Sequence, residues 1–312
     1  MSGLMDWRRM GSLDYNPTHW AAATAQVAAR AFGRLFGRDV MLYVGGVSFF
    51  ALLAVFPALA ILLGVYSLLL TPEAAAMQAD AFARLLPPGA HALFQGELQR
   101  LAHAPTQQVS AQSGAALLVG LYAAHRGFKA LIAGLSFIHD EDEPRGFVGF
   151  NVLAFVALLA AFGLLGALSG LFLAVRLLAS TLHLEPLKGI AWWASEWTWA
   201  SLGLTLGLTL VYRYAMSSRP VAWRASLFGG AAAAALSLVA SWASALYVKQ
   251  FADFGATYGS IAAVVVMLVW LSWNVNAVFY GGALATEIEL LVQRRTNGVV
   301  ASGPRTRRRR PS

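Results

Sequence analysis

Three basic side chains, His125, Arg126 and Lys129, form the densest group of ionisable residues inside an otherwise apolar stretch. His125 and Lys129 are four residues apart and share one face of a helix. At about 1.5 Å per residue, His125 lies roughly 20 Å along a helix that begins near Ser110. Cations at this depth cannot face lipid, and they indicate a cavity that receives a phosphate or carboxylate group. The alternative is a helix that ends early, with these side chains extending to the membrane surface.

Four adjacent acids follow this segment: Asp140, Glu141, Asp142 and Glu143. Carboxylates in this number are ligands for a divalent cation. A run of like charges is more often a solvated loop, and we favour that interpretation. A third interpretation pairs some of these acids with basic residues of neighbouring loops. No metal site is predicted from the run.

Polar residues in the last apolar segment, Asn274 and Asn276, are further candidates for substrate contact. Buried Asn side chains commonly form interhelical hydrogen bonds in lipid instead, worth about 1 kcal/mol each. Pro57 in the first apolar segment predicts a kink and a freed carbonyl, which serve either gating or shape. Gly166 and Gly170 are four residues apart, a spacing that lets helix backbones approach closely in lipid. We expect these glycines to pack the bundle, with dimerisation as the alternative.

The sequence holds no motif of a common catalytic or metal-binding type. It has no cysteine and 6 histidines, and no two histidines have the HExxH spacing. A phosphate-binding glycine loop and a GxSxG elbow are also missing. We therefore predict no catalytic residue, no metal, no cofactor and no enzyme activity.

The apolar character of the chain indicates a membrane protein. Of its 312 residues, 58% are hydrophobic and 12% are charged, whereas about 25% of the residues in a soluble protein are charged. A helix needs about 20 apolar residues to cross a bilayer core of about 30 Å. Six segments are long enough or nearly so: Met41–Thr71, Ser110–Ile132, Gly146–Val175, Gly189–Tyr212, Ala225–Val248 and Phe254–Thr286. The sequence therefore predicts an all-α, polytopic integral membrane protein with six transmembrane helices.

The distribution of charge predicts the orientation of these helices. The net charge is +8, and most of the 23 Lys and Arg residues lie in alternate flanking segments, beginning with the N-terminal one. Cytoplasmic segments collect Lys and Arg, so both termini are expected in the cytoplasm. The expected organisation is a cytoplasmic segment at 1–40, a six-helix domain at 41–290 and a basic, disordered tail at 291–312. Because the first forty residues show no cleavable signal, the first apolar segment is expected to remain in the membrane.

Short amphipathic helices are expected beside the membrane. In Trp20–Phe36, apolar residues that include Phe32 and Phe36 fall on one side, while Arg30 and Arg34 fall on another. This pattern predicts a helix in the inner interface with its arginines toward anionic headgroups. The alternative is an amphipathic helix packed on the protein. Two further helices are expected outside the membrane: Glu73–Leu86 and Ala90–Leu101.

Motifs at the two ends of the apolar region resemble those of a known family. The stretch Gly45–Pro57, which begins with Gly45 and Gly46, resembles the first-span signature of the YihY/virulence factor BrkB family. Tyr258 and Gly259, which open the last apolar segment, are similar to the family's C-terminal signature. The resemblance covers most of the chain and implies a six-span protein of the bacterial inner membrane, in which these glycines and Tyr258 have structural or gating roles.

The chain departs from this family's pattern at two places. Ala283 stands where the family usually has Glu, and Glu287, one helical turn later, is the candidate substitute. His139 stands where a Tyr is common in the family. Roles of the usual residues are therefore not carried over to Ala283 and His139.

Three functions are compatible with these residues. The first, which we favour, is a transporter or flippase for an anionic amphiphile, such as a phospholipid or a lipid-linked envelope precursor. The second is a structural or assembly protein of the cell envelope without transport activity. The third is the ribonuclease activity with which family members have been labelled, for which only the C-terminal arginines offer contact with RNA. The expected partners are membrane lipids, with anionic headgroups at the cytoplasmic face; no specific nucleic acid is expected, and a homo-oligomer stays open.

Overall fold

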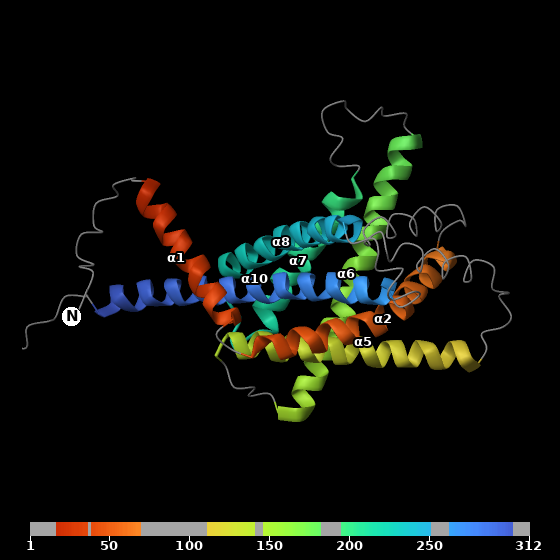
Figure 1. Ribbon diagram of the computed structural model, residues 1–312, viewed down its shortest axis with the longest axis horizontal. Coiled ribbons are helices and arrows are strands. Elements are labelled where there is room, and N and C mark those ends of the chain that lie inside the picture. The colour runs from red at the N-terminus through yellow and green to blue at the C-terminus, as the bar shows by residue number, and fades with distance from the viewer. Residues whose placement is uncertain are drawn as a thin grey trace, which may run out of the picture.

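The computed structural model describes residues 17–36, 39–69, 111–140, 146–181, 195–250 and 262–301. Within these ranges all regular elements are α-helices, as predicted. They are α1 (Pro17–Phe36), α2 (Val40–Leu69), α5 (Ala111–Ile138), α6 (Gly146–Thr181), α7 (Glu196–Tyr214), α8 (Trp223–Gln250) and α10 (Ala262–Ala301). In Figure 1, α10 runs along the long axis of the molecule, with α8 on one side and α2 and α5 on the other.

Each of the six predicted apolar segments overlaps one of these helices. The prediction is closest for Met41–Thr71, where α2 begins at Val40 and ends at Leu69. For Gly146–Val175, α6 begins at the same residue but extends to Thr181. At the other end of the chain, α10 extends to Ala301 and so enters the range predicted as a tail. Several predictions lie outside the described residues: the helices at 73–86 and 90–101, the acids Glu141, Asp142 and Glu143, and the motif residues Tyr258 and Gly259.

Three described helices are long and apolar enough to cross a membrane by themselves: Gly146–Val175, Trp223–Tyr247 and Val264–Gln293. A fourth crossing results if the bent pair Thr24–Phe36 and Val40–Val55 is counted as one span. The described structure is therefore that of a membrane-type protein with several apolar helices. The number of six crossings and the cytoplasmic position of both termini stay predictions.

The main hydrophobic core lies between α10 and the helices α2, α5 and α7. Phe279 and Leu135 are fully buried in it. The hydroxyl of Tyr212 donates a hydrogen bond of 2.6 Å to the backbone oxygen of Val278. Gly134 makes room for the ring of Phe279, because a Cβ atom on Gly134 would lie 2.7 Å from that ring. This core holds α5, the helix that carries the predicted basic residues.

Glycines bring the backbones of α7, α8 and α10 together. A Cβ atom on Gly229 of α8 would lie 2.5 Å from the backbone oxygen of Gly281 in α10. A Cβ atom on Gly230 would lie 2.6 Å from Thr209 Oγ1 of α7. Neither position has room for a side chain, so the three helices approach as small residues allow in lipid.

The helix α6 is less enclosed than the other candidate spans. It is steeply inclined to α2, α5 and α10 (Figure 1), and 17% of its apolar window is buried. Its 36 residues extend about 54 Å, more than the bilayer core, and such a helix is accommodated by tilting. The close packing predicted at Gly166 and Gly170 is not found among the described residues, none of which has an atom within 4 Å of a Cβ placed on either glycine.

The helix α1 packs on the protein, which is the alternative interpretation given above. Ala31 and Leu35 are buried in the main core. The prediction that the arginines face lipid headgroups is wrong for Arg34, whose side chain is 18% exposed and ion-paired inside the protein. The rings of Phe32 and Phe36, expected on the packed side, are instead more than half exposed and stack with centroids 4.4 Å apart. Arg34 turns inward because the buried carboxylate of Glu287 is a stronger partner than a hydrated surface.

Candidate functional site

Two of the predicted basic residues, His125 and Lys129, face the start of α6, and we call them the basic pair. Lys129 Nζ donates a hydrogen bond of 2.8 Å to Asn151 Oδ1. His125 Nε2 lies 3.2 Å from the backbone oxygen of the same Asn151. The amide of Asn151 in turn donates a hydrogen bond of 2.7 Å to the Phe147 carbonyl one turn earlier. The shared face predicted from the four-residue spacing therefore contacts a single residue of α6.

The ammonium of Lys129 is surrounded by neutral groups. Besides Asn151, it lies 5.3 Å from the centroid of the Phe147 ring and 5.6 Å from that of Phe150. Such contacts are worth about 0.5–1 kcal/mol at exposed sites and more where water is excluded. The ion pairs found among the described residues lie elsewhere. Within that part of the chain, no carboxylate neutralises this partly buried cation.

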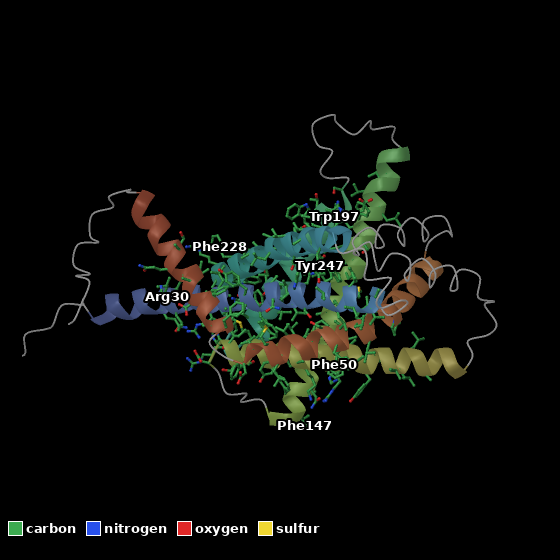
Figure 2. The ribbon with its side chains drawn as sticks, in the orientation of Figure 1. Arg30, Phe50, Phe147, Trp197, Phe228 and Tyr247 are labelled. Carbon is green, nitrogen blue, oxygen red and sulfur yellow. The ribbon has the colours of Figure 1, made fainter. Side chains whose placement is uncertain are left out.

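The third basic residue, Arg126, points away from the basic pair. Its guanidinium lies 5.7 Å from the centroid of the Phe50 ring on α2 and 6.0 Å from that of Tyr122. Figure 2 shows Phe50 and Phe147, which contact Arg126 and Lys129 respectively, toward the same edge of the bundle. The predicted group of three, all on α5, thus divides into a pair that contacts α6 and one exposed arginine beside α2.

A second polar cluster, which we call the ionic cluster, joins α1, α5 and α10 through Arg30, Arg34, Asp140 and Glu287. Arg34 Nε donates a hydrogen bond of 2.6 Å to Glu287 Oε1. Arg34 Nη1 donates one of 2.6 Å to Asp140 Oδ2 and one of 3.1 Å to the Ile138 carbonyl. Arg30 Nε lies 3.5 Å from Glu287 Oε2. The side chain of Glu287 is only 8% exposed, and these two arginines compensate its charge.

The ionic cluster bears on two of the sequence predictions. Asp140 pairs with a basic residue of a neighbouring element, as the third interpretation of the acidic run proposes. Its φ of 62° lies in the left-handed region, which Asp tolerates better than most residues. Glu287, the candidate substitute for the family's acid, occupies a buried and fully paired position.

The predicted polar residues of α10 bond within their own helix. The side-chain amide of Asn274 donates a hydrogen bond of 2.9 Å to the Trp270 carbonyl. That of Asn276 donates one of 2.8 Å to the Ser272 carbonyl. In the part of the chain that the structure describes, these two amide groups therefore bond within α10 and not to another helix. Their role as substrate contacts stays a prediction.

The predicted gating residues of α2 lie along its contact with α5. Pro57 is packed so closely on Gly120 that a Cβ atom there would collide with the proline ring. A Cβ atom on Gly46 would lie 3.9 Å from the Cβ of Ala130, whereas Gly45 has no atom within 4 Å of that position. Pro57 and Gly46 thus face α5, and their part in gating stays a prediction.

An apolar cavity of about 640 Å³ lies between α6 and α7. Phe128 and Leu131 of α5 contribute to its lining. Phe128 precedes Lys129 in the chain, and Phe150, whose ring contacts the ammonium, packs in the same small core as Phe128. The basic pair and the cavity are therefore separated only by the contact between α5 and α6.

Comparison with known proteins now identifies the family. The family model described as virulence factor BrkB matches residues 31–304. This chain belongs to the BrkB family. The match includes the basic pair and the whole cavity lining of this BrkB protein, and it confirms the resemblance that the motifs indicate.

One curated relative of this BrkB protein is the ribonuclease-like protein YfkH of Bacillus subtilis (strain 168). The two are 26% identical over 186 residues, which covers 57% of this chain and 65% of YfkH, less than two thirds of that relative. No solved structure matches the chain.

Asn151 contacts the basic pair but was not predicted from the sequence. It belongs to no recognised motif, and the prediction considered mainly the charged residues. Its signal is the position itself, because an amide early in a long apolar segment is costly to bury unless it is hydrogen-bonded.

Proposed function

We propose that this BrkB-family protein moves an anionic amphiphile, a phospholipid or a lipid-linked envelope precursor, across the bacterial inner membrane. The observation that carries the proposal is Lys129, a partly buried cation whose hydrogen-bond acceptor is a neutral amide. Ionisable residues inside membrane segments are costly and are found mainly at functional sites. The protein acts in this proposal as a transporter or flippase and not as an enzyme.

An anionic headgroup would supply the negative charge that Lys129 lacks. A phosphate oxygen carries a negative charge that the neutral amide of Asn151 lacks, so it attracts an ammonium group more strongly. A phosphate would therefore replace Asn151 Oδ1 at Lys129 Nζ, now 2.8 Å apart. His125, on the same face and next to the same residue, provides a second group that binds an anion when it is protonated.

The arrangement of helix ends supports an even number of crossings, which puts both termini on one side of the membrane; the distribution of Lys and Arg favours the cytoplasmic side. The ionic cluster joins the ends of α1 and α5 to α10. The turn between α7 and α8 lies at that same end, since Ser136 Oγ donates a hydrogen bond of 3.2 Å to the Met216 carbonyl. Glu289 of α10 also accepts a hydrogen bond of 3.0 Å from the backbone N–H of Ala222. The ends of several helices thus lie at one end of the bundle, as expected for a chain that crosses the membrane and returns.

A structural role in the envelope is the alternative function, and it predicts that Lys129 can be neutralised without loss of function. Ribonuclease activity is suggested only by the name of YfkH. In the described ranges, no three His, Asp or Glu side chains are grouped so that they could hold a metal ion. The uncompensated cation of the basic pair therefore favours the transport proposal.

Reconstitution of the full chain into vesicles tests this function. Fluorescent phosphatidylglycerol and phosphatidylcholine are incorporated separately, and an impermeant reductant then reports the lipid that reaches the outer leaflet. We expect phosphatidylglycerol to move faster in protein vesicles than in empty ones, and faster than phosphatidylcholine. Equal rates with and without protein for every anionic lipid would refute the proposal.

A single substitution tests the part assigned to Lys129. Lys129→Gln keeps a hydrogen-bond donor but removes the charge, and we expect phosphatidylglycerol movement to slow about tenfold, since about 1.4 kcal/mol of charge-assisted bonding is lost. The matched control is Arg219→Gln, at an exposed arginine in the turn between α7 and α8. A folded Lys129→Gln variant that moves the lipid as fast as the control would remove Lys129 from the site.

A further inference from the structure

The cavity between α6 and α7 runs the whole length of α7. Its lining includes Glu196 and Tyr214, the first and last residues of that helix. On α6 it extends from Leu153 to Phe172. The cavity is a groove open along one side. Because it follows α7 from its first to its last residue, it is an elongated groove and not a compact pocket.

Small residues keep the groove between the two helices narrow and deep. The side chain of Leu164 lies 3.4 Å from a Cβ placed on Gly207, and that of Leu168 lies 2.9 Å from one placed on Gly203. Because the two contacts run in opposite order along the chain, α6 and α7 are antiparallel here. Other small residues line the groove: Ala157, Ala160, Ala161 and Ala200.

The length and lining of the groove fit the hydrocarbon part of a lipid. The 19 residues of α7 extend about 28 Å, close to the bilayer core of about 30 Å. The lining of this cavity of about 640 Å³ is almost entirely apolar, with Ser169 and Glu196 among its few polar residues. Such a lining favours hydrocarbon and is too apolar for a headgroup.

The two ends of the groove differ in charge. Glu196 lines one end and Tyr214 the other, and Arg213 lies next to Tyr214 but outside the lining. The guanidinium of Arg213 stacks 5.2 Å from the ring centroid of Tyr214 and 4.3 Å from that of Trp223, and its Nη1 donates a hydrogen bond of 2.6 Å to the Val221 carbonyl. Its charge is not neutralised by an ion pair among the described residues. An anionic group on a chain in the groove would therefore favour the end near Arg213 over the end at Glu196.

We propose that this groove binds one acyl chain of a phospholipid, held along α7 with the phosphate toward Arg213. The site is distinct from the basic pair, which lies across the contact between α5 and α6. It goes beyond the transport function, because a lipid bound here is retained whether or not the protein moves lipids. Its test is therefore a binding measurement without vesicles.

Native mass spectrometry of the delipidated full chain in detergent measures this binding. Added dioleoyl phosphatidylglycerol is expected to bind with one lipid retained per chain, whereas phosphatidylglycerol with six-carbon chains is expected to bind at least about tenfold more weakly, because it buries far fewer methylene groups. Equal affinity for the long and short lipids, or no retained lipid at all, would overturn the proposal.

Variants that fill the groove locate the bound chain. Ala161→Phe together with Ala200→Phe places two rings in the groove, and we expect retention to fall at least about tenfold, the affinity equivalent of 1.4 kcal/mol. The matched control is Ala174→Phe, at an exposed position of α6 outside the lining. If the filled variant retains as much lipid as the control variant and the unmodified chain, the proposed site is refuted.

A labelling experiment on the unmodified chain keeps the test valid if the filled variant fails to fold. Phosphatidylglycerol with a photoreactive group in its acyl chain is irradiated on the detergent-solubilised protein, and the labelled peptides are mapped. We expect labelling at Ala157, Ala161 and Ala200 to exceed labelling at the outward residues Phe147 and Val148, which are 81% and 73% exposed. Labelling that follows exposure alone would contradict the proposal.

Discussion

The ionic cluster yields the sharpest prediction, through the substitution Glu287→Gln. Glutamine keeps an acceptor for Arg34 Nε, now 2.6 Å from the carboxylate, but removes the charge that Arg30 and Arg34 share. Breaking a buried ion pair costs about 3–5 kcal/mol when it leaves a charge without a partner. Arg34 here keeps its bond to Asp140, so we expect a loss of about 2 kcal/mol in the free energy of unfolding, typical of a charged hydrogen bond.

A double-mutant cycle with Asp140→Asn tests this reasoning. The side chain of Asp140 is 47% exposed, so water screens its pair and the single change should cost about 0.5 kcal/mol. In the double variant Arg34, whose side chain is 18% exposed, loses both of the carboxylates that pair with it among the described residues. We expect a total loss of about 4 kcal/mol, which exceeds the sum of the single losses by about 1.5 kcal/mol.

Unfolding in mixed micelles with increasing dodecyl sulfate, followed by tryptophan fluorescence, measures these free energies. The control is Asp39→Asn, at an exposed acid near the same end, which should change stability by less than about 0.5 kcal/mol. The reasoning is refuted if the effects of Glu287→Gln and Asp140→Asn are additive. It is equally refuted if Glu287→Gln is as stable as the control.

The same unfolding assay checks three further expectations. Tyr212→Phe removes the 2.6 Å hydrogen bond to α10 and should lower the free energy of unfolding by about 1 kcal/mol. An unchanged free energy would show that this bond does not contribute to stability. Gly229→Ala should cost about 1–3 kcal/mol, because its Cβ would meet the Gly281 oxygen at 2.5 Å; a neutral result would contradict this helix contact. Gly166→Ala should be neutral or stabilising by up to about 1 kcal/mol, because nothing lies within 4 Å of its Cβ; a clear loss would indicate a partner at that glycine.

The helices were predictable because hydropathy is a local property of the chain. A run such as Gly146–Val175 has one favourable conformation in lipid, where each backbone group must bond inside its own helix. The same holds for the shared face of His125 and Lys129, which follows from four-residue spacing in any helix. Neither inference needs knowledge of which helix is the neighbour.

The partners of these faces were not predictable from one sequence. The spacing of Gly166 and Gly170 predicts a close approach of helix backbones there, but the structure brings the backbones of α8 and α10 together at Gly229 and Gly281. The amphipathic pattern of α1 separates arginines from apolar residues, but it does not say that a buried acid on a distant helix attracts Arg34. Such pairings depend on tertiary packing, which spacing alone leaves undetermined.

The long sequence separation of the ionic cluster has a consequence for how the protein is made. Arg34 and Glu287 are 253 residues apart, on the first and last of the described helices. The ribosome releases α10 only after every other described helix has been synthesised, so Arg34 must wait for its main counter-ion throughout insertion. A chain cut short before Glu287 would leave Arg34 with Asp140 and would take from Arg30 the carboxylate that it contacts, so α1 would become fully anchored only after α10 is in place.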